Sequence, residues 1–234
     1  KIMILNNNKD QSEFYSLEKM KLDSTLLDKR NKGNNDPRFT RTEYITTYRI
    51  LKYPNNKTLD HMLTLGVSPY VLKDNREINW KLESEFTEIL AFKVQKATTI
   101  FGGRKWIAYF TKDIPFFDGP YKFRGLPGLI VKIADENEQH VFVLFCVKTY
   151  PESFVYPSSV SLKDLPAVDY TMFIKKFKEY RGNPAADLIG SIPDQPDRNG
   201  NMKTGTEIWL EISKKEKEKV KKDNNILEID LLQN

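Results

Sequence analysis

Few residues in this chain could act as nucleophiles or as metal ligands. It has one cysteine, Cys146, and two histidines, His61 and His140, so an intrachain disulfide and a multi-histidine metal centre are both excluded. Cys146 lies in the apolar run 141–147, where we expect it to pack as a small buried hydrophobe. It cannot form a dyad with His140, because residues six apart on one strand lie about 20 Å from each other. We therefore assign no catalytic residue, metal ligand or cofactor from these residues.

Paired carboxylates are the remaining route to catalysis, because two Asp or Glu side chains can share general acid and base roles. The first candidates are Asp113 and Asp118, which flank Pro115. Arg104 or Lys122 could then stabilise developing negative charge. Ordinary surface aspartates explain the same pattern, so a carboxylate-dependent hydrolase stays an alternative.

The most unusual segment is 113–131, with three prolines, three glycines and four aromatic residues. Pro127 and Gly128 suit the central positions of a type II turn. If the chain before them is extended, Tyr121 and Phe123 share one side of it and Lys122 and Arg124 the other. We also expect Trp106 to pack against the Pro127–Gly128 bend.

Two interpretations of this segment remain open. It is either a stiff plug that closes one end of a sheet or a rigid loop that presents aromatic and cationic groups to a ligand. Backbone geometry explains most of its residue types, which favours the plug. The structural positions are Gly119, Pro120, Gly125, Leu126, Pro127, Gly128, Leu129 and Ile130. The candidate binding residues are Arg104, Trp106, Tyr109, Asp113, Tyr121, Lys122, Phe123 and Arg124.

The elements that position these residues are mostly strands, because apolar and polar residues alternate between Gly, Pro and Asn breaks. A hairpin is predicted from 88–101 and 104–111 around Gly102 and Gly103, with Trp106, Ala108 and Phe110 on one face. A second hairpin is predicted from 129–134 and 140–150, and both of its strands look buried on both faces. Segments 41–53, 59–72, 76–82 and 206–212 are also expected to contain strands.

One helix is predicted near 169–181, capped by Asp169. We expect a loop-rich segment at 183–205 and a charged connector at 213–225. Together these features predict a single β-rich domain over 1–234. It is mainly β, with an antiparallel sheet that forms a sandwich or half-open barrel and one or two short helices.

The distribution of charge along the chain argues against a nucleic-acid partner. The 37 basic and 32 acidic residues are mixed along most of the chain, whereas nucleic-acid binders concentrate basic residues with aromatics on one face. No run of about 18 apolar residues occurs, so we expect no membrane-spanning segment.

The hexapeptide Gly125-Leu126-Pro127-Gly128-Leu129-Ile130 resembles the signature of the GLPGLI family of Bacteroidetes. The match continues in its flanks, at Trp80-Lys81-Leu82, Gln95-Lys96-Ala97, Gly103-Arg104, Trp106, Ala108, Ile114-Pro115 and Gly119-Pro120-Tyr121-Lys122-Phe123. The chain departs from the family at Val94, where relatives often have cysteine.

The family is largely uncharacterised and supplies no catalytic residues. The resemblance implies an exported protein, periplasmic or associated with the outer membrane, whose signal peptide is not present in this sequence. It also implies a partner such as a TonB-dependent transporter. The leading hypothesis is therefore a non-enzymatic β-rich protein that binds a partner protein or ligand as an accessory to outer-membrane transport. The alternatives are a periplasmic carrier of a lipid or other apolar ligand and the hydrolase described above.

Overall fold

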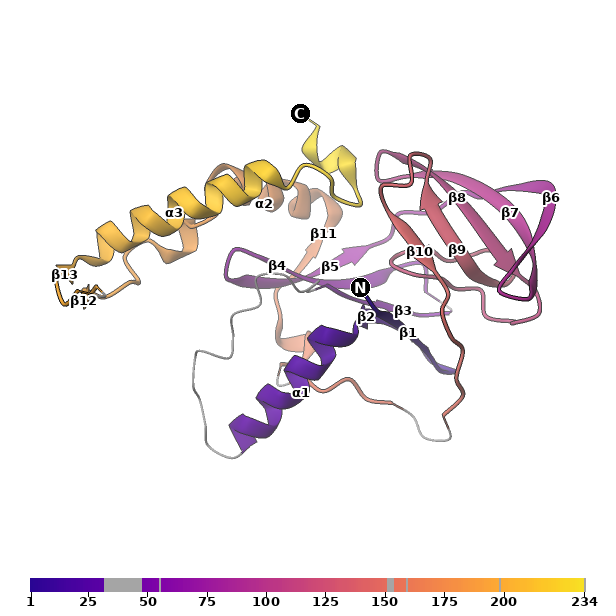
Figure 1. Cartoon of the computed structure of the whole chain (residues 1–234), viewed down its shortest axis with the longest axis horizontal. Helices are drawn as coiled ribbons and strands as arrows, with labels where there is room; N and C mark the ends of the chain where they lie inside the picture. The colour runs from indigo at the N-terminus through magenta and orange to yellow at the C-terminus, as the bar shows by residue number, and fades with distance from the viewer. Residues whose placement is uncertain (32–47, 55, 151–153, 159, 198, 234) are drawn as a thin grey trace.

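Two sheets packed face to face form the body of the protein (Figure 1). The computed structural model describes residues 1–31, 48–54, 56–150, 154–158, 160–197 and 199–233. Among these residues, no helix is long and apolar enough to cross a membrane. The first part of the predicted strand 41–53 lies outside the described residues.

The first sheet has the order β1-β2-β3-β4-β5-β11. Its neighbours are antiparallel, except that β11 runs parallel to β5. The strands are β1 (Met3–Asn7), β2 (Ser12–Ser16), β3 (Arg49–Lys52), β4 (Leu59–Leu65), β5 (Ser68–Asp74) and β11 (Ala167–Asp169).

The second sheet has the order β10-β9-β8-β7-β6 and is antiparallel throughout. Its strands are β6 (Lys81–Ile89), β7 (Phe92–Phe101), β8 (Arg104–Thr111), β9 (Leu129–Asp135) and β10 (Val141–Val143). The predicted Gly-Gly hairpin joins β7 to β8, and Gly102 and Gly103 adopt the positive φ values of 61° and 75° that the turn needs.

The main core lies between the two sheets. Phe14, Ile50 and Leu59 come from the first sheet, and they pack with Trp106 and Ile133 of the second. Trp106 belongs to the predicted inward row of β8, whose members are all buried: Trp106, Ala108 and Phe110. The mainly β class with sandwiched sheets is confirmed.

Three α-helices accompany the sheets: α1 (Leu17–Asn31), α2 (Tyr170–Gly182) and α3 (Gly205–Lys222). Helix α2 confirms the predicted helix, and the Asp169 carboxylate accepts the Met172 N–H at its start. Its Phe173 enters a second core with residues of β4 and β5 such as Leu63 and Leu72.

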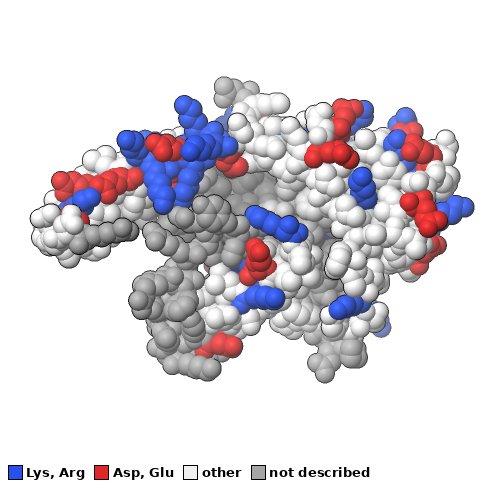
Figure 2. Space-filling model, viewed as in Figure 1, with Lys and Arg blue, Asp and Glu red and all other residues white. Residues whose placement is uncertain are grey.

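The strand predicted at 206–212 is wrong, because these residues begin helix α3. Thr204 and Glu207 form a reciprocal capping box at its start, and this box outweighs the local alternation. The charged segment 213–225 falls largely within the same helix. Figure 2 shows Lys and Arg side chains gathered over the C-terminal half of α3.

Short elements complete the C-terminal third. Within 183–205 lie a 3₁₀ turn at Ala186–Leu188 and the small hairpin of β12 (Gln195–Pro196) and β13 (Met202–Lys203). Two more 3₁₀ turns lie at Leu162–Asp164 and Ile229–Leu232. The strand predicted at 76–82 begins only at its end, because β6 starts at Lys81.

The second predicted hairpin is confirmed only in part. Strand β9 is buried on both faces as expected. Strand β10 is not, because it ends at Val143 on the edge of its sheet and leaves Val141 and Val143 exposed. The chain beyond it stays exposed, with Phe145 at 92%. Cys146 is therefore exposed, and its predicted burial in the core is wrong.

Candidate functional site

The segment that joins β8 to β9, residues 112–128, forms a compact loop that bonds mainly to itself; we call it the motif loop. The chain reverses so that Gly125 N–H donates to the carbonyl oxygen of Phe117 at 3.2 Å, and Ile130 N–H donates to that of Asp118 at 2.9 Å. Asp118 and Arg124 also form an isolated antiparallel bridge. The loop is thus bonded to the first residues of β9, as a stiff plug requires.

The bend at Pro127 is tighter than predicted. Gly128 N–H donates to the carbonyl oxygen of Leu126 at 2.8 Å, which is the i to i+2 bond of a γ-turn. Leu129 N–H is directed to the carbonyl oxygen of Ile114 instead, so the predicted type II turn is wrong. Gly128 has φ of 157°, and a Cβ there would lie 1.9 Å from the Thr111 carbonyl oxygen. Glycine is required because the neighbouring backbone occupies that space.

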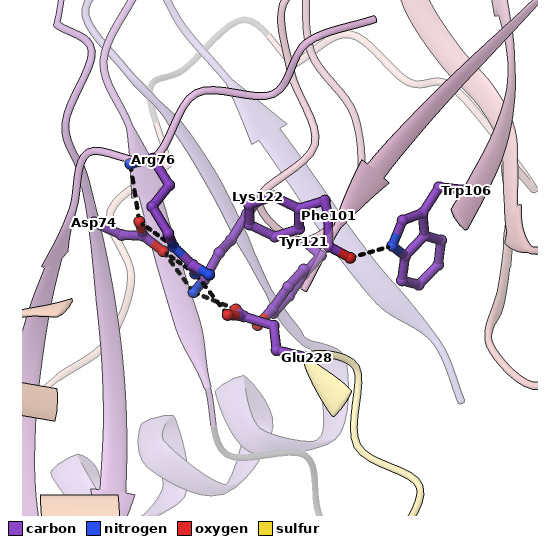
Figure 3. Close-up of polar contacts among 7 residues, drawn as sticks. All are labelled: Asp74, Arg76, Phe101, Trp106, Tyr121, Lys122 and Glu228. Atoms are coloured by element: carbon purple, nitrogen blue, oxygen red, sulfur yellow. Dashed lines mark hydrogen bonds and ion pairs between the residues drawn. The ribbon is translucent and has the colours of Figure 1, made fainter. Parts of the chain in front are cut away.

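The predicted alternation of side chains along 121–124 is also wrong. Tyr121 has φ of 53°, a left-handed conformation that is uncommon for an aromatic residue. Phe123 N–H donates to the carbonyl oxygen of Pro120 at 3.1 Å and closes this turn. As a result Tyr121 and Lys122 both reach Glu228 (Figure 3).

Aromatic rings fix the motif loop to the second sheet. Phe123 is fully buried, and its ring centroid lies 4.7 Å from that of Trp106. The Trp106 indole N–H donates to the Phe101 carbonyl oxygen at 2.9 Å. Tyr121 and Trp80 also contact the Phe123 ring. Trp106 therefore packs against the Phe123 ring of the motif loop, and its expected contact with the Pro127–Gly128 bend stays a prediction.

Four charged side chains meet beneath the motif loop and form a buried cluster of Asp74, Arg76, Lys122 and Glu228 (Figure 3). Lys122 Nζ lies 2.8 Å from Asp74 Oδ2 and 2.5 Å from Glu228 Oε1. Arg76 Nη2 lies 2.6 Å from a carboxylate oxygen of each. The Lys122 side chain is only 1% exposed, and such burial is tolerated only because the two cations and two carboxylates cancel.

Burial and the charges within the cluster shift the pKa values of its carboxylates and of the neighbouring Tyr121. Burial opposes ionisation of Glu228, but the charges of Lys122 and Arg76 outweigh it and lower the pKa of Glu228 to about 2. Burial likewise opposes ionisation of Asp74, and bonds from Arg76 and Lys122 hold its pKa below the usual value. Burial and the Glu228 charge raise the pKa of Tyr121 well above its usual value. The carboxylates therefore stay charged at neutral pH, and Tyr121 stays a hydrogen-bond donor.

A cleft of about 760 Å³ opens beside the motif loop and reaches this buried cluster. Its walls come from residues 7–9, 12, 52–54, 56, 57 and 59 in the first sheet and its turns, from 74 and 76–79, from Phe101, and from motif-loop residues 115–118, 122, 124 and 125. The volume is in the range of small-ligand sites. Phe116 and Phe117 line it and are 47% and 64% exposed.

A second buried ion pair holds the motif loop against the first sheet at the same cleft. Lys52 pairs with Asp118 and also donates to the Gly119 carbonyl oxygen at 2.6 Å. Burial lowers the pKa of Lys52, and the Asp118 charge opposes this shift. Arg124 crosses the cleft wall and donates to the carbonyl oxygens of Tyr53, Asn56 and Lys57. The cleft is therefore braced from both sides.

His61 is buried next to the cluster. Both of its ring nitrogens lack a hydrogen-bond partner within the described residues, and the ring lies 5.9 Å from that of Tyr121. Burial, with the nearby Lys122 charge, lowers the pKa of His61 to about 3. It is therefore neutral in the folded protein. The sequence did not decide whether the His61 side chain faces the core or the solvent, and in the structure it is buried.

The structure separates the candidate binding residues. Only Lys122 and Arg124 line the cleft. Trp106, Tyr121 and Phe123 are buried in the core, and Arg104 is 8% exposed with bonds to Asp135 and to the Ile226 carbonyl oxygen. Tyr109 lies half-buried on the opposite face of β8 from the core, and Asp113 is exposed and does not line the cleft. A binding role for these residues stays a prediction.

Sequence reasoning missed Asp74, Arg76, Glu228 and Lys52. The first three lie far from Lys122 in the chain, and no local pattern marked any of them. Within the described residues, no three His, Cys, Asp or Glu side chains form a set that could hold a metal ion.

Comparison with known protein families finds a match in the region of the motif loop. Residues 103–132 match the model of a Bacteroidetes-associated family described as a protein of unknown function (Porph_ging). The match covers β8, the motif loop and the start of β9, and it is compatible with the GLPGLI resemblance without confirming that name. No curated protein matches the chain.

Two crystal structures of PNGF-II, in different space groups, resemble the chain at 16% identity with TM-scores of 0.46 and 0.49. Each comparison covers 76% of this chain and 30% of the PNGF-II chain. The protein thus spans about a third of the length of these matched structures.

Proposed function

We propose that this chain is an exported, non-enzymatic β-rich protein that binds a partner protein or ligand in the cleft beside the motif loop. The observation that carries the proposal is that the cleft is held open by interactions of the chain with itself. The Lys52–Asp118 pair and the Arg124 bonds fix its two sides. A site that is ordered before binding loses little conformational entropy when the ligand arrives.

The exposed rings at the cleft support binding over a purely structural loop. Phe116 and Phe117 are adjacent and are 47% and 64% exposed, although the rest of the motif loop buries its aromatic residues. Exposed aromatic side chains beside a concave site are typical anchors for a partner. Core packing does not account for these two rings.

The geometry supports the two alternatives less well. The hydrolase hypothesis needs Asp113 and Asp118 at one place, but Asp118 is paired with Lys52 and Asp113 does not line the cleft. The apolar carrier needs space between the sheets, where Trp106, Phe123 and Ile133 are at most 1% exposed. The cleft is lined by charged as well as apolar side chains, so it is not a continuous apolar cavity.

The cellular setting of the proposal rests on the family resemblance. We place the protein in the periplasm or at the outer membrane, as an accessory to a TonB-dependent transporter. The cleft would then hold a segment of the transporter or a ligand that the transporter handles.

Affinity capture from native cell envelopes tests this function, with mass spectrometry of the bound proteins and small molecules. The test variant is the double substitution Phe116→Ser and Phe117→Ser, which removes the exposed rings without touching the core. The control is Phe145→Ser, which removes a ring that is 92% exposed outside the cleft. We expect a molecule that the wild type and the control retain and the double variant loses. Equal retention by all three proteins would contradict the proposal.

A further inference from the structure

The charges that line the cleft do not balance. Six cationic side chains line it against three carboxylates, and Glu228, directly behind two of the cations, supplies a fourth. The buried cluster is neutral, Lys52 is paired with Asp118, and Lys57 is paired with Glu77. Two positive charges remain, and they belong to Lys9 and Arg124. Neither has a carboxylate partner among the residues that the structure describes.

Arg124 is the more informative of the two because its guanidinium is half-buried and forms no direct ion pair within the described residues, although the charges of Asp118 and Asp74 act on it. Its bonds go to the backbone carbonyl oxygens of Tyr53, Asn56 and Lys57. These use three of the five N–H donors that a guanidinium carries. Within the described part of the chain, the other two donors have no bonded acceptor, and Arg124 lines the cleft. Burial lowers the pKa of Arg124, which is the sign of a cation that lacks full compensation.

An apolar surface lies on the same cleft as these donors. Phe116 and Phe117 line the cleft together with Arg124. A guanidinium matches the two oxygens of a carboxylate or phosphate, and exposed rings favour an apolar group next to that anion.

We propose that the cleft selects an oxyanion, carboxylate or phosphate, joined to an apolar or aromatic group, with Arg124 and Lys9 binding the oxyanion. This inference rests on the proposed function and names its ligand class. Lys9 is exposed and contributes through the local field. Arg124 contributes directed hydrogen bonds, so it sets the preference for the anion.

Four probes on one phenylpropyl skeleton test the inference: 3-phenylpropionate, 3-phenylpropyl phosphate, 3-phenylpropanamide and 3-phenylpropylamine. Their affinities are measured by titrating the isotope-labelled full chain and following the NMR signals of residues that line the cleft. We expect the two anions to bind roughly tenfold tighter than the amide or the amine. The ratio of the two anions distinguishes a carboxylate from a phosphate site.

Two variants assign the preference to the proposed residues. Arg124→Gln is expected to remove most of it, measured as the ratio of anion to amide affinity, because Arg124 also braces the cleft wall and its loss can lower the affinity of both probes. Lys9→Gln changes only an exposed side chain, so it keeps the fold and is expected to reduce the preference by a smaller factor. The inference is overturned by amide or amine affinity equal to that of the anions, by an unchanged preference in both variants, or by anions that leave the cleft signals unshifted. The envelope capture tests the proposed function separately. If a partner is retained through the Phe116 and Phe117 rings, the proposed function is supported even when the cleft shows no preference for anions.

Discussion

Replacing His61 by phenylalanine should remove a large part of the acid sensitivity of the protein. The imidazole is 7% exposed, and neither ring nitrogen has a partner among the described residues. It packs edge-on against the rings of Tyr48 and Tyr121. A phenyl ring has nearly the same shape and carries no proton-binding nitrogen, so the substitution isolates the titration.

The size of the effect follows from the pKa of His61, which is about 3 in the folded protein and 6.5 in the unfolded chain. Below pH 6.5 the unfolded state takes up a proton that the folded state refuses, so stability falls as the pH drops from 6.5 towards 3. Between pH 7 and pH 5 the loss is roughly 2 kcal/mol in the free energy of unfolding. The charged groups that influence His61 are Lys122, Glu228, Asp74 and Arg76. The two carboxylates among them have lowered pKa values and titrate at lower pH.

The assay is urea unfolding of the wild type and of His61→Phe at both pH values. The wild type should lose roughly 2 kcal/mol more than the variant on acidification. His140 is present in both proteins, so the comparison isolates the effect of His61. The same pH dependence in both proteins would refute the reasoning, because it would mean that His61 has a partner or reaches solvent.

Three further predictions concern the motif loop and the exposed edge. Lys122→Met should cost about 3–5 kcal/mol in unfolding free energy, because it leaves buried carboxylates undercompensated; a loss below about 1 kcal/mol would place Lys122 in solvent. Gly128→Ala should destabilise the protein far more than Gly125→Ala in thermal melts. A Cβ at Gly128 would lie 1.9 Å from the Thr111 carbonyl oxygen, whereas a Cβ at Gly125 would have no neighbouring atom within 4 Å. Equal losses would contradict the close approach. The thiol of Cys146 should react with a thiol reagent in the native protein as fast as in urea, and protection would mean that the edge segment is covered.

The second sheet was largely predictable because its signals are local. The Gly102–Gly103 turn fixes the hairpin, and alternation assigns Trp106 to the inner face. The loop was recognisable as a stiff bend for the same reason. The details of that bend were not, since the conformation of Tyr121 and the γ-turn at Pro127 depend on what the loop packs against.

Local sequence patterns gave wrong predictions where secondary structure or burial depends on the surrounding residues. The run 140–150 is apolar enough for a central strand, but it lies at the edge of its sheet, so Cys146 is exposed. The alternation of 206–212 was overridden by the capping box of Thr204 and Glu207, which starts a helix that continues to Lys222.

The buried cluster could not be found from the sequence. Lys122 meets Asp74 and Glu228 across separations of 48 and 106 residues, and each is an ordinary charged residue in its own segment. The chain holds 37 basic and 32 acidic residues, so composition does not single out these three. Only the folded arrangement of the two sheets and the C-terminal segment brings them together.

Native-state amide hydrogen exchange of the motif loop tests the central claim most directly. The amides of Phe123, in the loop, and of Ile130, at the start of β9, donate to the loop carbonyl oxygens of Pro120 and Asp118. If the loop is a clamped plug that shapes the cleft, both amides should exchange with the same free energy of opening as the amides in the middle of β8 and β9. Exchange of these two amides through a separate opening several kcal/mol less costly than global unfolding would contradict the account.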